Sequence, residues 1–497
     1  MIYKNPIIPG YNPDPSCIRV GDDYYLVTST FEHFPGVPIY HSKNLVNWEL
    51  IGHCLTKDSQ LDLIGTPSSK GIYAATIRYH EGRFYMVTTH TSGLGNFFVY
   101  TDDIYGEWSD PIKVDAGGID PSLFWDDDGK CYFCSNPKGI VAFEIDPNTG
   151  EVLSDRHTLT FGTGGRALEA PHMYKKDGMY YLICAEGGTE LGHRVTVFRS
   201  QNVFGPYESC PNNPILCHQE RDLPISATGH ADIFEDENGN WWMVFLGYRM
   251  LPRLKLQILG RETFLAPMKW EVGWPVVGLG GYALPEMDAP LPKIETVKPV
   301  CHDVSYDFDK DSFDKRFTFV RNPERERYIH DKDSRTLTLI GSGTSLDDVN
   351  AQPTFAGVRQ PDFNILLTAK LDLKNTDAKK AGISIMQTAG YHHDIYVETE
   401  NGDTYAVFSR TAAFINDKPG RVMLTDCDEA ELFIKGDNKY LYFGIMAGDT
   451  QITLGKALCA SLCSETVVPR SFTGVFLGMF AQYGKAAFKA FDLRVTE

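Results

Sequence analysis

One residue pattern recurs five times in the first half of the chain. Each copy has an alternating apolar segment, a turn containing Asp or Gly, and a second segment that opens with aromatic residues. The copies begin at Asp14, Tyr73, Asp120, Glu169 and His230, which are 47 to 61 residues apart. Turn residues between alternating segments are the signature of a β-hairpin. The first half therefore predicts five hairpins in succession.

This spacing fits the four-stranded blade of a β-propeller, in which radial repetition protects the edges of the sheets. Sustained helical periodicity is missing from this part of the sequence, which argues against a (β/α) barrel. We expect an all-β chain in which residues 1–283 form a five-bladed β-propeller.

Aligning the copies identifies one equivalent position in every blade. The alignment uses the apolar residues Ile18, Ile77, Phe124, Met173 and Phe234, and the position four residues earlier holds three carboxylates, a tyrosine and a histidine. Equivalent positions at the ends of inner strands converge on the axis of a propeller. We therefore expect these five side chains to line one small cavity at the propeller axis.

A fourth carboxylate is expected at the same place. The hairpin of the fourth copy turns at Asp177-Gly178, which places Glu186 across the hairpin from Glu169. Gly187 and Gly188 follow, and glycine lets a substrate approach the backbone closely.

Composition excludes some partners. Acidic residues (65) outnumber basic ones (47), giving a formal charge of −18. Such a charge disfavours nucleic acid and anionic membranes, which bind through clustered Lys and Arg. The first residues lack the pattern of a signal peptide, and eleven scattered cysteines are expected to be reduced. We expect a cytoplasmic protein with a neutral, small ligand.

Converging carboxylates repel each other, so their pKa values separate. Glycoside hydrolysis needs this difference, because one carboxyl must stay protonated while another is ionised. A carboxylate cage for a cation such as Ca²⁺ is the alternative. Asp14 and Asp120 also precede proline, and Asp-Pro is an ordinary turn opener.

Several short motifs follow one another along the chain: Asn12-Pro13-Asp14-Pro15-Ser16, Asp120-Pro121-Ser122, Glu169-Ala170-Pro171-His172, Glu186-Gly187-Gly188-Thr189, Gly229-His230-Ala231-Asp232 and Gly260-Arg261-Glu262-Thr263. As a set they resemble glycoside hydrolase family 43, in particular its β-xylosidase and α-L-arabinofuranosidase members. The resemblance implies a five-bladed propeller enzyme that acts on chain ends with inversion.

The resemblance also implies roles for individual residues. Asp14 would be the general base, Glu186 the general acid, and Asp120 the residue that orients Glu186 and raises its pKa. The residues expected at the substrate are Phe31, Tyr73, Glu169, Thr189, His230 and Arg261.

The resemblance implies no cofactor for the chemistry. It leaves open whether a structural cation such as Ca²⁺ binds near His230. One motif departs from the family, because Tyr73-Ala74-Ala75 stands where its xylosidases commonly have Trp-Ala-Pro. This change bears on the preference between xylose and arabinofuranose.

The second half has a different pattern. Residues 284–303 have the proline density of a linker, and residues 304–497 contain many short alternating segments. Asn401-Gly402 between two such segments predicts a hairpin. We expect an antiparallel β-sandwich. The family resemblance implies that it is a jelly-roll, lectin-like domain packed on the propeller. Such a domain either closes one side of the active-site pocket and makes subunit contacts, or binds sugar itself.

The sequence thus predicts an inverting exo-glycoside hydrolase that releases terminal β-D-xylose or α-L-arabinofuranose from small oligosaccharides. An endo-arabinanase-like hydrolase and a non-catalytic carbohydrate-binding protein are the alternatives. A homo-oligomer is compatible with this interpretation.

Overall fold

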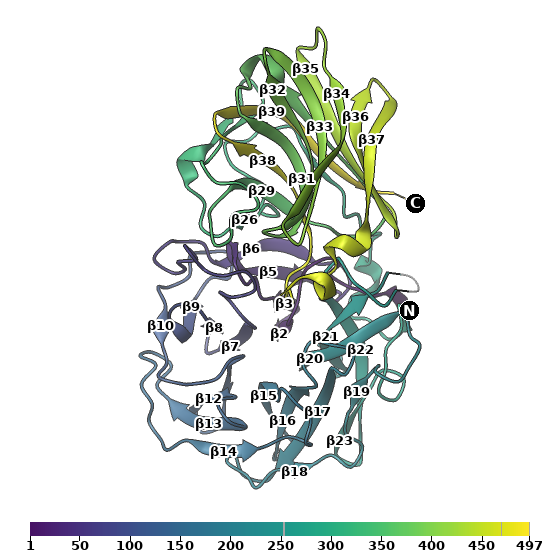
Figure 1. Cartoon of the computed structure of the whole chain (residues 1–497). Helices are drawn as coiled ribbons and strands as arrows, with labels where there is room; N and C mark the ends of the chain where they lie inside the picture. The colour runs from purple at the N-terminus through teal and green to yellow at the C-terminus, as the bar shows by residue number, and fades with distance from the viewer. Residues whose placement is uncertain (252–253, 469, 497) are drawn as a thin grey trace.

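Five four-stranded antiparallel sheets surround a central axis in the first half of the chain, as Figure 1 shows below the second domain. The computed structural model describes residues 1–251, 254–468 and 470–496. The five hairpins predicted from the repeats are the first two strands of the five sheets, so the prediction of a five-bladed propeller is confirmed.

The blades follow one another along the chain. Their strands are β2 (Ser16–Val20), β3 (Asp23–Val27), β5 (Gly36–Ser42) and β6 (Glu49–Leu55) in blade 1; β7 (Thr76–His80), β8 (Arg83–His90), β9 (Gly95–Thr101) and β10 (Ile112–Lys113) in blade 2; β11 (Ser122–Trp125), β12 (Cys131–Ser135), β13 (Ile140–Ile145) and β14 (His157–Thr160) in blade 3; β15 (Glu169–Lys176), β16 (Met179–Glu186), β17 (Arg194–Ser200) and β18 (Glu208–Ser209) in blade 4; and β20 (Ile225–Glu235), β21 (Trp241–Arg249), β22 (Glu262–Glu271) and β23 (Trp274–Val277) in blade 5.

Shorter strands complete the propeller. β19 (Leu216–Cys217) pairs with β17, and β1 (Ile2–Lys4) pairs with β24 (Glu286–Asp288). The segment expected as a linker therefore includes a strand that pairs with the first residues of the chain, followed by the 3₁₀ turn η1 (Ile294–Thr296).

A buried ion pair ties four blades together at the axis. Asp232, which is fully buried, lies 2.8 Å from a guanidinium nitrogen of Arg78. It also accepts hydrogen bonds from the hydroxyls of Ser16, at 2.5 Å, and Tyr174. These residues come from blades 5, 2, 1 and 4, so one carboxylate joins strands that are far apart in the sequence.

The second domain is a two-layered β-sandwich, as predicted. One sheet has the order β27 (Tyr328–Asp331), β28 (Thr336–Ile340), β39 (Lys485–Val495), β30 (Ile365–Asp372), β35 (Glu429–Gly436), β36 (Tyr440–Ala447) and β37 (Thr450–Leu458), with β25 (Val304–Tyr306) on β39. The other has the order β29 (Thr354–Arg359), β38 (Phe476–Gln482), β31 (Lys380–Thr388), β32 (Tyr391–Glu400), β33 (Asp403–Ala412) and β34 (Ile415–Met423). Four 3₁₀ turns lie between strands of this domain: η2 (Arg325–Arg327), η3 (Leu373–Asn375), η4 (Cys459–Leu462) and η5 (Ser464–Thr466).

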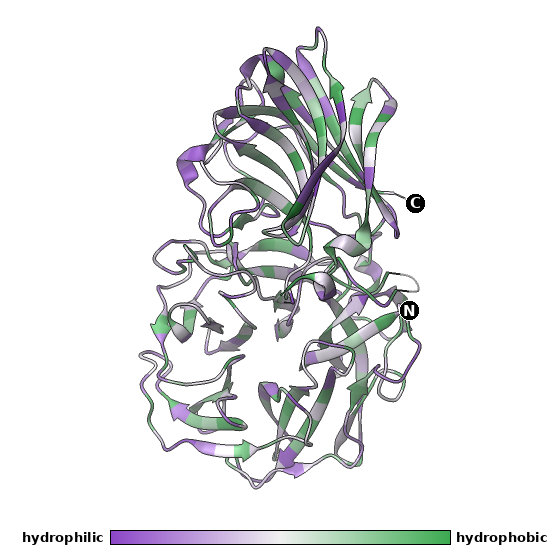
Figure 2. Ribbon diagram, viewed as in Figure 1, coloured by the Kyte–Doolittle hydropathy of each residue, from purple (hydrophilic) through white to green (hydrophobic). Residues whose placement is uncertain are grey.

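Alternating side chains fill the space between the two layers. In β30 every second residue is buried, beginning with Ile365 and Leu367, and Figure 2 shows the mixture of hydrophobic and hydrophilic residues along the strands. The hairpin predicted at Asn401-Gly402 is present between β32 and β33, and both turn residues have the positive φ of a type I′ turn.

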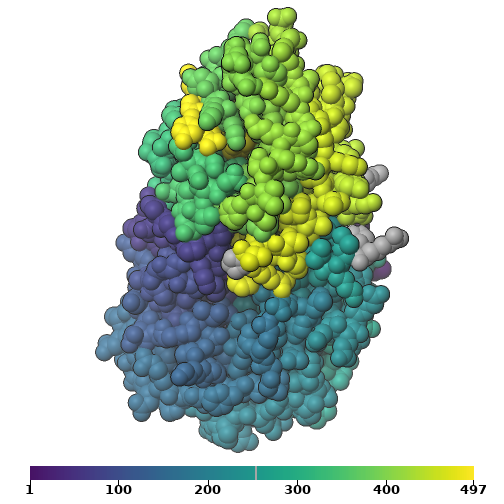
Figure 3. Space-filling view, in the orientation of Figure 1, coloured from purple at the N-terminus to yellow at the C-terminus, as the bar shows by residue number. Residues whose placement is uncertain are grey.

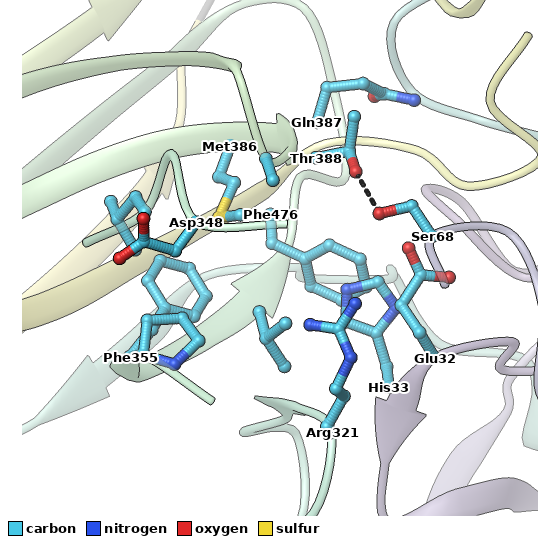
Figure 4. Close-up of a pocket in the computed structure, with 14 residues that line it drawn as sticks. Glu32, His33, Ser68, Arg321, Asp348, Phe355, Met386, Gln387, Thr388 and Phe476 are labelled. Carbon is cyan, nitrogen blue, oxygen red and sulfur yellow. Dashed lines mark hydrogen bonds between the residues drawn. The ribbon is translucent and has the colours of Figure 1, made fainter. Parts of the chain in front are cut away.

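The two domains pack directly against each other (Figure 3). β4 (His33–Phe34) of the propeller pairs with β26 (Phe319–Val320), and the His33 ring stacks on Phe476 with centroids 4.1 Å apart. Figure 4 shows this contact zone, where the Thr388 hydroxyl donates a hydrogen bond of 2.7 Å to Ser68. The sandwich is therefore placed to form part of a site on the propeller.

Among the described residues, no helix combines the length and the apolar character that a bilayer crossing requires.

We predict that Asp232→Ala lowers the free energy of unfolding by about 3–5 kcal/mol, because it leaves the Arg78 guanidinium buried without its partner. Asp102→Ala is the matched control, since Asp102 pairs with Arg83 at 2.8 Å but is 73% exposed. We expect this control to change stability by less than about 1 kcal/mol. Urea unfolding measures both, and equal losses would contradict the proposed role of the axial ion pair.

Candidate functional site

A cavity of about 300 Å³ opens at the axis of the propeller. All five residues at the equivalent blade positions line it: Asp14, Tyr73, Asp120, Glu169 and His230. Phe31, Thr189 and Arg261, which the sequence also places at the substrate, lie in the same wall. The volume is at the lower end of the range for small-molecule sites.

The backbone turns several of these side chains into the cavity. Asp14, Asp120 and His230 have φ values of 56°, 51° and 46°, in the left-handed region that L-residues rarely adopt. This conformation costs about 1 kcal/mol or more per residue. Its repetition at equivalent positions of three blades indicates a requirement of the site.

Asp14 forms a buried ion pair on the cavity floor. Nη1 of Arg261 lies 2.6 Å from its Oδ1, and both side chains are at most 4% exposed. The hydroxyl of Ser29 donates to Oδ2. Nδ1 of His230 lies 3.5 Å from Oδ1, so three groups orient this carboxylate.

Two other carboxyls have raised pKa values. Burial raises the pKa of Glu169 to about 7, and the charge of Asp14 adds to this increase, while Arg261 and Arg166 oppose it. Burial also raises the pKa of Asp120 well above its usual range, helped by the charges of Glu169 and Asp14. The site therefore combines two carboxyls with raised pKa values and Asp14, which is paired with a guanidinium.

Glu186 does not line the cavity. Its side chain is fully buried and accepts hydrogen bonds from the backbone N–H groups of Thr163, at 2.8 Å, and Gly165, at 3.0 Å. The hydroxyls of Thr163 and Thr196 donate to it as well. A carboxylate enclosed in this way has no access to a substrate, so the expectation that Glu186 is the general acid is corrected.

A β-bulge explains this difference from the sequence analysis. His172 to Lys176 pair with β16 in the register that the turn at Asp177-Gly178 predicts, but Glu169 pairs with Ala185 instead of Glu186. The register shifts between Glu169 and His172. Because neighbouring residues of a strand point to opposite faces, this shift turns Glu186 away from the cavity.

Aromatic rings form one wall. The rings of Phe31 and Tyr73 lie 4.9 Å apart, and Phe31 contacts the Arg261 guanidinium at 5.2 Å. Apolar ring faces next to fixed polar groups suit the binding of a sugar ring.

Phe472 of the sandwich domain lines the cavity as well, and the sequence analysis did not identify it. Its carbonyl accepts a hydrogen bond of 3.1 Å from Arg261, and its N–H donates one of 2.9 Å to Ser69. The sandwich therefore closes one side of the site and contacts the arginine that holds Asp14.

The rim of the cavity contains two further residues that the sequence analysis missed, Arg166 and Glu190. Nη2 of Arg166 lies 2.8 Å from Oε1 of Glu190. The run of glycines at 162, 164 and 165, directly before Arg166, was a sequence signal for a backbone that approaches other groups closely.

His230 lies beside charged groups of both signs. Its carboxylate neighbour Asp14 is already paired with Arg261, whose positive charge is close to the ring. Burial lowers the pKa of His230, the charge of Asp14 opposes this shift, and the charge of Arg261 adds to it. Within the described ranges, no three His, Cys, Asp or Glu side chains gather as a metal centre requires.

Comparison with known families gives two matches, which together span most of the chain. Residues 3–275 match glycosyl hydrolases family 43, and residues 305–494 match the β-xylosidase C-terminal concanavalin A-like domain.

Individual relatives are similar over the full length. The non-reducing end α-L-arabinofuranosidase BoGH43B of Bacteroides ovatus is 38% identical over 100% of this chain and 95% of its own. Xylosidase/arabinosidase 43B of Humicola insolens is 32% identical over 98% and 96%. The structure of GH43B from the B. ovatus xyloglucan PUL superimposes with a TM-score of 0.94 at 38% identity, and that of BlXynB from Bacillus licheniformis with 0.93 at 32%, each covering 100% of both chains. The chain is a member of glycosyl hydrolase family 43, with the C-terminal domain of its β-xylosidases.

Proposed function

We propose that the protein removes terminal β-D-xylose or α-L-arabinofuranose from short oligosaccharides with inversion of configuration. The observation that carries this proposal is the cavity that Asp14, Asp120 and Glu169 line together, with Phe472 of the sandwich on one side. Relatives named α-L-arabinofuranosidase and xylosidase/arabinosidase support these two sugars.

Asp14 is the proposed general base. Inversion needs a carboxylate that takes a proton from the attacking water, on the face of the sugar opposite to the leaving group. The contacts with Arg261, Ser29 and His230 fix Asp14 in one orientation, which is what a base on the cavity floor requires.

Glu169 is the proposed general acid, in place of Glu186. It lines the cavity, and its pKa of about 7 keeps it protonated in weakly acidic solution and about half protonated at neutral pH. A protonated carboxyl can donate to the glycosidic oxygen as the bond breaks. Asp120 lies beside it, and we assign to Asp120 the role of holding and tuning this acid.

The other cavity residues bind the sugar. Arg261 and His230 present donors to hydroxyl groups, Phe31 and Tyr73 provide the apolar wall, and the backbone around Thr189 borders the opening. No step of this mechanism uses a cation.

An exo mode fits the closed side of the cavity better than an endo mode, because endo cleavage needs a groove open at both ends. Phe472 and its hydrogen bond to Arg261 occupy one side. The carboxyls with raised pKa values favour an enzyme over a carbohydrate-binding protein, since binding alone does not need them. The eleven free thiols fit a reducing, cytoplasmic location.

The activity is tested with 4-nitrophenyl β-D-xylopyranoside and 4-nitrophenyl α-L-arabinofuranoside. We expect hydrolysis of at least one of them, and proton NMR should show the product sugar first in the anomeric configuration opposite to that of the substrate. Retention of configuration, or hydrolysis of internal arabinan bonds only, would contradict the proposal.

The assignment of the acid predicts a dependence on the leaving group. Glu169→Gln should reduce kcat on xylobiose or arabinobiose about a thousandfold. The loss should be far smaller on a 2,4-dinitrophenyl glycoside, because dinitrophenolate departs without a proton. Asp14→Asn should impair both substrates alike, since water activation is needed for each. Leaving-group dependence in Glu186→Gln instead of Glu169→Gln would restore Glu186 as the acid.

The pH profile provides an independent test. kcat/KM should fall as pH rises through about 7, because Glu169 then loses the proton that it must donate. Arg166→Ala removes a positive charge that lowers the pKa of Glu169, so the falling limb of the profile should move to higher pH. Asp102→Asn, an exposed change on the surface, should leave the limb in place. A limb that stays in place or moves to lower pH in Arg166→Ala would argue against Glu169 as the group that sets it.

A further inference from the structure

The rim of the cavity differs from its floor in exposure and charge. The floor residues Asp14 and Asp120 are 2% and 5% exposed. At the rim, the side chains of Arg166 and Glu190 are 61% and 51% exposed. A sugar bound on the floor has its scissile bond directed outward, so the part of the substrate beyond that bond passes the rim.

The local backbone holds the Arg166 side chain at this place. The carbonyl of Arg166 accepts a hydrogen bond of 2.7 Å from the N–H of Gly187. Its guanidinium lies over Gly188, where a Cβ atom would be only 2.7 Å from Nη2. Glycine at 188 therefore leaves the space that the guanidinium occupies beside Glu190.

Arg166 precedes the proposed acid by three residues, and both line the cavity. Its positive charge is among the groups that lower the pKa of Glu169, in opposition to burial. The proposed proton donor and the rim guanidinium thus reach one cavity from the same short segment of the chain. The glycosidic oxygen receives its proton from Glu169, so the leaving group lies next to Arg166.

The sandwich domain extends the rim. Nη1 of Arg470 lies 3.6 Å from Oε1 of Glu190, and Nη2 of Arg470 lies 3.4 Å from Glu465. Glu190 therefore sits between a guanidinium of each domain. Ion pairs this exposed contribute little to stability, so a contribution to folding does not explain them.

Building on the proposed function, we propose that Arg166 and Glu190 form the binding subsite for the sugar that leaves. Arg166 has several N–H donors and Glu190 has acceptor oxygens, which together match the hydroxyl groups of a ring. Their charges cancel, so the subsite suits a neutral sugar unit. The two residues thereby favour oligosaccharides over glycosides whose leaving group lacks hydroxyls.

Kinetics of Arg166→Ala test this at about pH 6, where Glu169 is protonated in both proteins. We expect KM for xylobiose or 1,5-arabinobiose to rise about tenfold, because hydrogen bonds from a charged donor are lost. On the corresponding 4-nitrophenyl glycoside, kcat/KM should stay within about twofold. Arg156→Ala is the matched control, since Arg156 bonds to Asp115 outside the cavity and should change neither value. Equal losses on both substrates, or no loss on either, would overturn the proposal.

A binding measurement separates this proposal from the proposed function. In the Glu169→Gln background, calorimetry gives the Kd of xylobiose and of D-xylose, and of 1,5-arabinobiose and L-arabinose, without turnover. Adding Arg166→Ala should weaken disaccharide binding about tenfold and leave monosaccharide binding unchanged. An unchanged disaccharide Kd overturns the subsite. If the wild-type protein cleaves no glycoside in the panel, the proposed function fails. The ratio of the disaccharide Kd values with and without Arg166→Ala still decides whether the rim recognises a second sugar.

Discussion

Compensation of buried negative charge at the propeller axis is the constraint on which the rest of the structure depends. Moving a carboxylate out of water costs several kcal/mol unless a partner offsets it. Asp14 and Asp232 each have a guanidinium nitrogen within 2.8 Å, from Arg261 and Arg78. Glu169 has no ion pair among the described residues, and its raised pKa means that a proton balances it instead. This difference separates the carboxyl that we propose as the base from the one that we propose as the acid.

The second domain contacts Arg261, the residue that compensates the charge of Asp14. Its guanidinium joins Asp14 of blade 1 to the carbonyl of Phe472, so the orientation of the base depends on a loop that follows it by more than 450 residues. Packing of the sandwich on the propeller therefore affects chemistry as well as access. A propeller alone would leave the Nη2 atom of Arg261 without this acceptor.

Much of the fold could be predicted because the information was local and repeated. Five copies of one hairpin pattern were enough to predict five blades, and alignment of the copies identified Asp14, Asp120 and Glu169 as members of one cavity. Phe472 and Arg470 could not be found in this way. Their role depends on how the sandwich packs against the propeller, which no pattern within either domain records.

Glu186 shows where local reasoning fails and why. Its motif with two glycines looks catalytic, and only the bulge beside Glu169 reverses the face to which it points. Its buried carboxylate nevertheless supports the site, since it binds the backbone of the loop at Thr163 and Gly165. That loop leads directly into Arg166 and Glu169. A carboxylate is suited to this task because it accepts several hydrogen bonds at once, and an amide would turn donors towards the N–H groups of the loop. In the proposed mechanism, Glu186 thus acts through the residues that follow the loop it holds.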